Sequence, residues 1–134
     1  MGYNPHGHYE LWVEGTTLFA KVSGSWNMEC AQEFEKEFMA LAQHFSDGWG
    51  HIVCLNDWEL GTLEVSEVIE RLVEWCIVNG LERAANVYQP SALKHAVINK
   101  MIVSEQDGFV RAAFDNLQDA ADWLTEEGFP TAIE

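Results

Sequence analysis

The best candidates for chemistry in this chain are Asp57 and Glu59, two carboxylates that flank Trp58. They stand where a strand with four apolar residues at 52–55 is predicted to run into an acidic, aromatic loop. An apolar run without polar alternation is typical of a strand buried on both faces, as in a parallel sheet covered by helices. If the segment after this strand excluded water, the two carboxylates would raise each other's pKa and one could act as a general acid. A solvated segment with both carboxylates ionised is the alternative, and it is the interpretation that we adopt.

Other catalytic and metal-binding patterns are missing from the sequence. It contains no G-x-S-x-G elbow, no H-E-x-x-H pair, no Walker loop and no G-x-G-x-x-G after a strand. Two nearby histidines, His6 and His8, have no third ligand beside them and do not predict a metal site. The three cysteines are an odd number without C-x-x-C spacing, so they predict neither a disulfide framework nor a zinc site. We therefore predict a protein that is not an enzyme and holds no cofactor.

Length and charge restrict the class of protein further. A chain of 134 residues with 48% apolar residues can bury one ordinary core, which we assign to residues 9–134 after a loose lead-in at 1–8. Lysine and arginine number 7 against 22 acidic residues, a formal charge of -15 that disfavours nucleic acid and anionic membranes as partners. No apolar run is long enough to span a membrane and the first residues lack a signal-peptide pattern, so we expect a soluble cytoplasmic protein.

Apolar periodicity predicts strands that alternate with helices. Period-two alternation and apolar runs predict strands at 9–13, 18–22, 51–57, 83–88 and 109–114. Spacings of three and four predict helices at 28–45, 65–77, 93–101 and 117–124. The short, glycine-containing segment 14–16 predicts a hairpin between the first two strands, and the polar segment 104–108 predicts a turn.

This order of elements predicts an α/β fold: one mixed, mostly parallel sheet of about five strands, with an N-terminal β-hairpin and four helices. Ligands of such sheets collect outside the carboxyl ends of the strands, although polar residues there also serve as helix N-caps. The candidate binding residues at these ends are Ser25, Trp26, Asp57, Trp58, Glu59, Gly61, Thr62, Gln89 and Ser91.

The element order and the strand that leads into Asp57 resemble the STAS-type fold of anti-sigma-factor antagonists, and more closely its SpoIIAA-like branch, which is likened to CRAL-TRIO lipid carriers. The resemblance covers residues 8–128. In phosphorylated antagonists the corresponding strand runs into Asp-Ser-Ser-Gly, and a partner kinase phosphorylates the second serine. Here Asp57 matches the aspartate, Trp58 and Glu59 replace the serines, and Gly61 comes one residue late. The resemblance thus implies a bacterial regulatory module without the usual phosphorylatable serine, in which Glu59 would be a permanent, partial mimic of the phosphate.

Two classes of function remain open. The first is a module that docks a protein through residues 57–62 and the following helix. The second is a carrier or sensor of a small apolar, lipid-like ligand, in which four tryptophans would line a pocket or its entrance: Trp12, Trp26, Trp58 and Trp75. Ordinary packing of these tryptophans is the alternative to a pocket. Trp75 and Val78, if exposed, would form a patch for a homodimer.

Overall fold

The computed structural model describes residues 7–59, 63–101, 105–106 and 108–130. Its strands are β1 (His8–Glu14), β2 (Thr17–Ser25), β3 (Trp49–Glu59), β4 (Leu81–Val87), β5 (Glu105–Gln106) and β6 (Phe109–Phe114). Its helices are α1 (Met28–Ala42), α2 (Leu63–Val78), α3 (Ala92–Met101) and α4 (Leu117–Glu126). No helix among the described residues is long and apolar enough to cross a membrane.

The strands form one sheet in the order β1-β2-β3-β4-β6-β5. β2, β3, β4 and β6 run parallel, while β1 at one edge and β5 at the other pair antiparallel to their neighbours. The predicted α/β class, the mostly parallel sheet with its N-terminal hairpin and the four helices are confirmed. The sheet differs in having six strands among the described residues, because part of the segment predicted as a turn pairs with β6 as β5.

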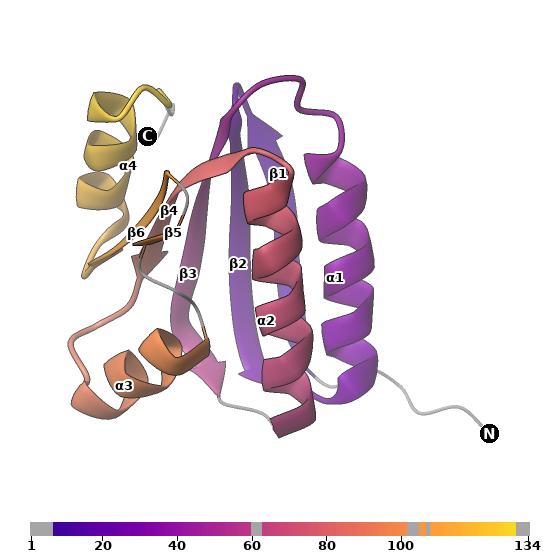
Figure 1. Cartoon of the computed structure of the whole chain (residues 1–134). Helices are drawn as coiled ribbons and strands as arrows, with labels where there is room; N and C mark the ends of the chain where they lie inside the picture. Colours follow the sequence, from indigo (N-terminus) through magenta and orange to yellow (C-terminus); the bar gives the residue numbers. More distant parts are fainter. Residues whose placement is uncertain (1–6, 60–62, 102–104, 107, 131–134) are drawn as a thin grey trace.

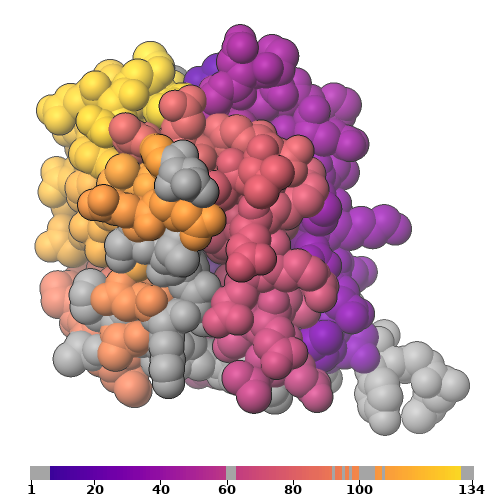
Figure 2. All heavy atoms as spheres, in the orientation of Figure 1, coloured from indigo at the N-terminus to yellow at the C-terminus, as the bar shows by residue number. Residues whose placement is uncertain are grey.

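Helices cover both faces of the sheet (Figure 1). α1 and α2 lie side by side on one face, where they and Ile98 of α3 join the larger core cluster. Their side chains cover much of this face in the space-filling view (Figure 2). α4 packs on the opposite face through Ala120, Ala121 and Leu124. The middle strands are thus buried on both sides, as the apolar run at 52–55 predicts.

Local capping sets several element ends. The side chain of Asn27 accepts a hydrogen bond from the Cys30 N–H at 3.0 Å, and Asn116 does the same for Asp119 at 2.8 Å. Asn27 is therefore the N-cap of α1, and Asn116 is the N-cap of α4. α1 ends three residues before the predicted position, yet Phe45 still packs, with its ring stacked 5.1 Å from that of Trp49.

β3 extends two residues beyond its predicted end, and it contains a bulge. Lys21 of β2 pairs with Cys54, whereas Ser23, two residues on, pairs with Asp57, three residues on. One extra residue in β3 shifts the alternation of side chains between the two faces. In a regular strand Leu55 and Trp58, three positions apart, would face opposite sides of the sheet. Because of the bulge, both side chains lie in the larger core.

Candidate functional site

The bulge in β3 decides where the central candidate residues lie. The prediction that Trp58 and Glu59 belong to a loop after Asp57 is wrong, since both lie in β3 together with Asp57. Trp58 is 5% exposed and packs in the core, with its ring T-shaped against that of Trp26 at 5.8 Å. Asp57 and Glu59 on either side of it are exposed. Gly61 and Thr62 lie outside the described residues.

The exposed end of β3 lies beside the end of β2. Ser25 pairs with Glu59 in the parallel register, and its hydroxyl donates a hydrogen bond to the Glu59 carboxylate. Both side chains are exposed, as is that of Asp57. This is a solvated acidic edge rather than a desolvated carboxylate pair, so it does not provide the conditions for a general acid.

Gln89 and Ser91 connect elements on the other side of β3. The Gln89 N–H donates to the side-chain oxygen of Asn56 at 2.6 Å, and the Gln89 amide donates to the Asp115 carbonyl at 3.0 Å. Ser91 accepts a hydrogen bond from the Lys94 N–H at 3.2 Å, as an N-cap of α3 does. The structure therefore brings Gln89 together with the ends of β3 and β6, whereas Ser25 and Glu59 form a separate group.

An open cleft of about 560 Å³ lies at the carboxyl ends of β4 and β6. Its lining residues are Tyr88, Pro90, Ser91, Ala113, Phe114, Asp115 and Asp119. The Asp115 and Asp119 carboxylates accept hydrogen bonds from the Asn116 amide at 2.8 and 2.9 Å. Since Asn116 is the cap of α4, these two carboxylates have a structural explanation.

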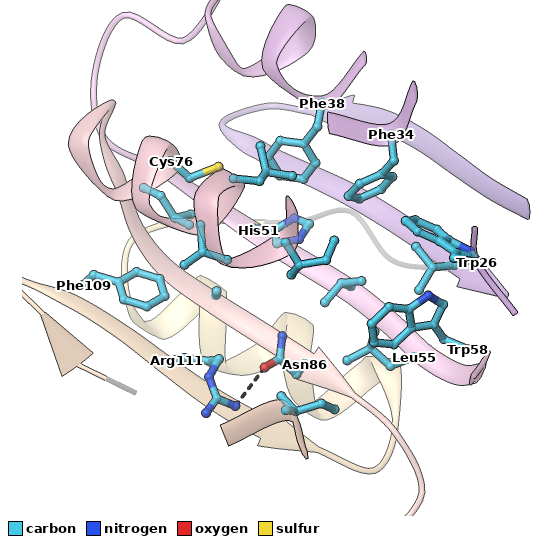
Figure 3. A pocket seen from close by; sticks show the side chains of 18 residues that line it. Trp26, Phe34, Phe38, His51, Leu55, Trp58, Cys76, Asn86, Phe109 and Arg111 are labelled. Carbon is cyan, nitrogen blue, oxygen red and sulfur yellow. Dashed lines mark hydrogen bonds between the residues drawn. The ribbon is translucent and has the colours of Figure 1, made fainter. Parts of the chain in front are cut away.

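A second hollow lies inside the protein, between the sheet and α1, α2 and α3 (Figure 3). This cavity has a volume of about 80 Å³ and an almost wholly apolar wall. Its lining residues are Val22, Trp26, Phe34, Phe38, His51, Val53, Leu55, Trp58, Ile69, Leu72, Val73, Cys76, Leu81, Ala84, Asn86, Ile98, Phe109 and Arg111.

Of the four tryptophans predicted to line a pocket, Trp26 and Trp58 do so. Trp12 does not, because it stacks on Phe19 at 5.2 Å, and Phe19 belongs to the core on the α4 face. Trp75 packs against the larger core without lining the cavity. Val78 near it is 84% exposed, and self-association through this end of α2 stays a prediction.

Three polar side chains in the cavity wall are missing from the sequence-based candidates: His51, Asn86 and Arg111. Arg111 donates to the side-chain oxygens of Asn86 at 3.0 Å and Asn99 at 2.5 Å, and burial lowers the pKa of its guanidinium. The signal for all three was available, because each stands next to apolar residues within its strand.

His51 is half-buried and lines the cavity (Figure 3). Its Nδ1 is 2.7 Å from the Leu18 carbonyl oxygen, and its ring is T-shaped against that of Phe38 at 5.0 Å. Burial lowers the pKa of His51 to about 4, and the hydrogen bond to Leu18 opposes this only in part. The imidazole is therefore neutral at neutral pH.

The indole Nε1 of Trp58 is buried without a hydrogen-bond partner in the part of the chain that the structure describes. Trp26, its neighbour, donates its own Nε1–H to the Ser23 carbonyl at 3.0 Å. An unsatisfied buried donor costs about 1–3 kcal/mol. Trp58 thus lines the cavity with an apolar ring whose N–H group has no hydrogen-bond acceptor among the described residues.

Comparison with solved structures assigns this architecture to the SpoIIAA-like fold, which confirms the fold that the sequence resembles. An uncharacterised DUF3478-family protein with a SpoIIAA-like fold from Shewanella loihica matches with a TM-score of 0.70 at 18% identity, over 92% of this chain and 98% of that one. An anti-sigma factor antagonist from Mycobacterium paratuberculosis matches with a TM-score of 0.59 at 14% identity, over 89% and 94%.

The protein TM1081 matches with a TM-score of 0.60 at 14% identity, over 93% of this chain and 94% of that one. At these identities the likeness concerns the fold alone. No family model and no curated protein matches the sequence.

Proposed function

We propose that this protein is a non-enzymatic cytoplasmic regulatory module that binds a protein partner through the adjoining ends of β2 and β3. An anti-sigma factor antagonist shares the fold over most of both chains, and its name describes action through another protein. The observation that carries the proposal is the exposure of Asp57 and Glu59 on either side of the buried Trp58.

A basic partner surface suits this end of the molecule. Asp57 and Glu59 present two carboxylates next to the Ser25 hydroxyl, on a chain whose formal charge is -15. Charge of one sign steers association with an oppositely charged partner and penalises acidic competitors. The same charge argues against polyphosphate partners, so nucleic acid is not the expected ligand.

Glu59 gives the surface a fixed negative charge at the position where the resemblance implies a phosphorylated serine. Ser25, its partner in β2, holds the carboxylate by a hydrogen bond. A carboxylate has less charge than a phosphate and fewer acceptor oxygens, so it is a partial mimic. Stoichiometric phosphate on Thr62 or Ser66 after incubation with a kinase extract would contradict this hypothesis.

The test uses the whole chain and a Glu59→Lys variant as baits, with Glu126→Lys as a control. Both variants change the net charge equally, but Glu126 is exposed at the far end of α4. We expect a partner that the wild type and the Glu126→Lys variant retain and the Glu59→Lys variant loses. Equal retention of every captured protein by all three baits would refute the proposed surface.

A second candidate function is a carrier or sensor of a small apolar ligand, and the observation that favours it is the apolar cavity. Its volume of about 80 Å³ is roughly half that of an engineered cavity that accepts benzene, at about 150 Å³. A small molecule therefore suits this cavity better than a long acyl chain. Native mass spectrometry of the purified protein tests the idea, because a bound ligand adds its mass to the chain and an empty cavity adds none.

A further inference from the structure

Two residues of the cavity wall have a ring nitrogen that no described residue hydrogen-bonds: His51 through Nε2, and Trp58 through Nε1, which is buried. Nδ1 of His51 lies 2.7 Å from a carbonyl oxygen, which can only accept, so Nδ1 carries the ring proton. Nε2 then has a free lone pair, and it has no hydrogen-bond partner within the described ranges. Trp58 is the complementary case, a buried N–H donor that meets no acceptor there.

Both side chains belong to β3 and line the same cavity (Figure 3). The lowered pKa of His51, about 4, keeps Nε2 an acceptor at neutral pH. Phe38 packs against the imidazole and Trp26 against the indole. Two rings are thus fixed by aromatic neighbours while one nitrogen of each remains without a partner.

The cation in the wall has a different environment. Arg111 donates to the amide oxygens of Asn86 and Asn99, so polar groups of the protein hold its guanidinium in place. The two nitrogens that need a partner, on His51 and Trp58, are neutral. A charged ligand would also lose its hydration in this apolar cavity, which disfavours an anion.

We propose that the cavity binds a small, uncharged, mainly apolar molecule with a hydroxyl group, which donates a hydrogen bond to Nε2 of His51. This inference rests on the second candidate function and names its ligand class. Trp58 lies seven residues from His51 along β3, about 20 Å between the two Cα atoms, so its N–H does not share this hydroxyl. The volume of about 80 Å³ favours an alcohol with a short, branched carbon skeleton over a phenol or a lipid.

The first experiment titrates the isotope-labelled wild-type chain with isobutanol, isobutyrate and xenon, and follows the His51 imidazole and the Trp58 indole by ¹⁵N NMR. Isobutanol and isobutyrate share a branched skeleton but differ in charge, and xenon fills apolar cavities without forming hydrogen bonds. We expect isobutanol to bind saturably and shift the Nε2 resonance. We expect isobutyrate to bind at least about tenfold more weakly, because its charge must be desolvated.

The second experiment repeats the titrations on His51→Phe, with His44→Phe as a control on an exposed histidine. Phenylalanine keeps a ring beside Phe38 but removes the acceptor. We expect the affinity for isobutanol to fall about three- to tenfold, which is the range for one hydrogen bond, and that for xenon to stay within about twofold. The control variant should bind both as the wild type does.

The outcomes separate the ligand class from the function on which it rests. Entry of xenon without saturable binding of isobutanol would overturn the hydroxyl class and leave an apolar carrier standing. Entry of neither would overturn both. Tighter binding of isobutyrate than of isobutanol, with no shift at Nε2, would also overturn the proposal. If His51→Phe does not fold, the wild-type comparison of the three probes still decides the question.

Discussion

The half-buried histidine in the cavity wall, His51, gives the protein a pH-dependent stability that can be calculated. Burial lowers the pKa of His51 to about 4 in the folded chain, whereas an unfolded chain has a value of about 6.5. Between these values the unfolded state binds a proton that the folded state does not. The free energy of unfolding therefore falls as the pH falls from about 6.5 to about 4.

The difference between the two pKa values corresponds to a total loss of about 3 kcal/mol, of which about 2 kcal/mol is lost by pH 5. Urea denaturation followed by circular dichroism at about pH 7 and about pH 5 measures this loss. His51→Phe removes the group, so the wild type should lose about 2 kcal/mol more than the variant over this interval. Other titrating groups contribute equally to both proteins.

His44→Gln is the matched control, since His44 is exposed and the replacement removes an imidazole from the surface. Its pH profile should follow that of the wild type. If wild type and His51→Phe lose the same free energy of unfolding between pH 7 and pH 5, the reasoning about the half-buried neutral imidazole is refuted.

Three further substitutions test the structural account by urea denaturation. Trp58→Ser should lower the free energy of unfolding by about 3–5 kcal/mol, because it empties a core position. Trp12→Ser, at a position 40% exposed, should lower it by about 1 kcal/mol. Equal losses would contradict the inward position of Trp58. Gly80→Ala should cost about 1 kcal/mol or more, because φ is 102° there and an added Cβ would lie 3.3 Å from the Trp49 ring. Gly128→Ala should cost less, because φ is similar at 103° but the added Cβ would meet no atom within 4 Å; the reverse order would contradict this. Asn116→Ala should cost about 1 kcal/mol and Asn116→Ser, which keeps a capping oxygen, much less; similar values would exclude the cap.

Most of the architecture could be predicted because its signals are local. The three-and-four spacing in α2 and the apolar run in β3 each depend on residues close together in the chain. Capping by Asn27 and Asn116 is equally local, since each bonds a backbone N–H three residues later. A helix between two strands brings the chain back to the start of the sheet, so successive strands run parallel and the crossovers are right-handed.

The end of β3 and the sixth strand could not be predicted because they depend on pairing partners. The bulge before Asp57 is defined by how β2 and β3 align, and the sequence of β3 alone contains no sign of it. A polar residue after an apolar run is normally a loop signal, which explains why Trp58 and Glu59 were expected in a loop. β5 has two residues and exists through its pairing with β6.

The cavity shows a different limit of sequence reasoning. A histidine, an asparagine and an arginine, each next to apolar residues within its strand, signal partly or fully buried polar groups, and this signal was available in the sequence. Their mutual arrangement was not, because Arg111 reaches Asn86 only through the adjacency of β4 and β6 and Asn99 only through the position of α3. Polar residues within apolar stretches of strands therefore identify candidate site residues from the sequence. Their contacts become known only from the order of the strands in the sheet.

The alternation of side chains after the bulge makes the two candidate functions separable by mutation. Asp57 and Glu59 project to solvent, whereas Trp58 between them forms part of the cavity wall. Replacing the two carboxylates changes the proposed partner surface without removing an atom from the cavity. Replacing His51 changes the cavity at a distance of several residues along β3 without altering the charge of that surface at neutral pH. Two independent binding functions on one strand would be established by two results together. Variants of Asp57 and Glu59 would lose binding of the partner alone, and variants of His51 would lose binding of the alcohol alone.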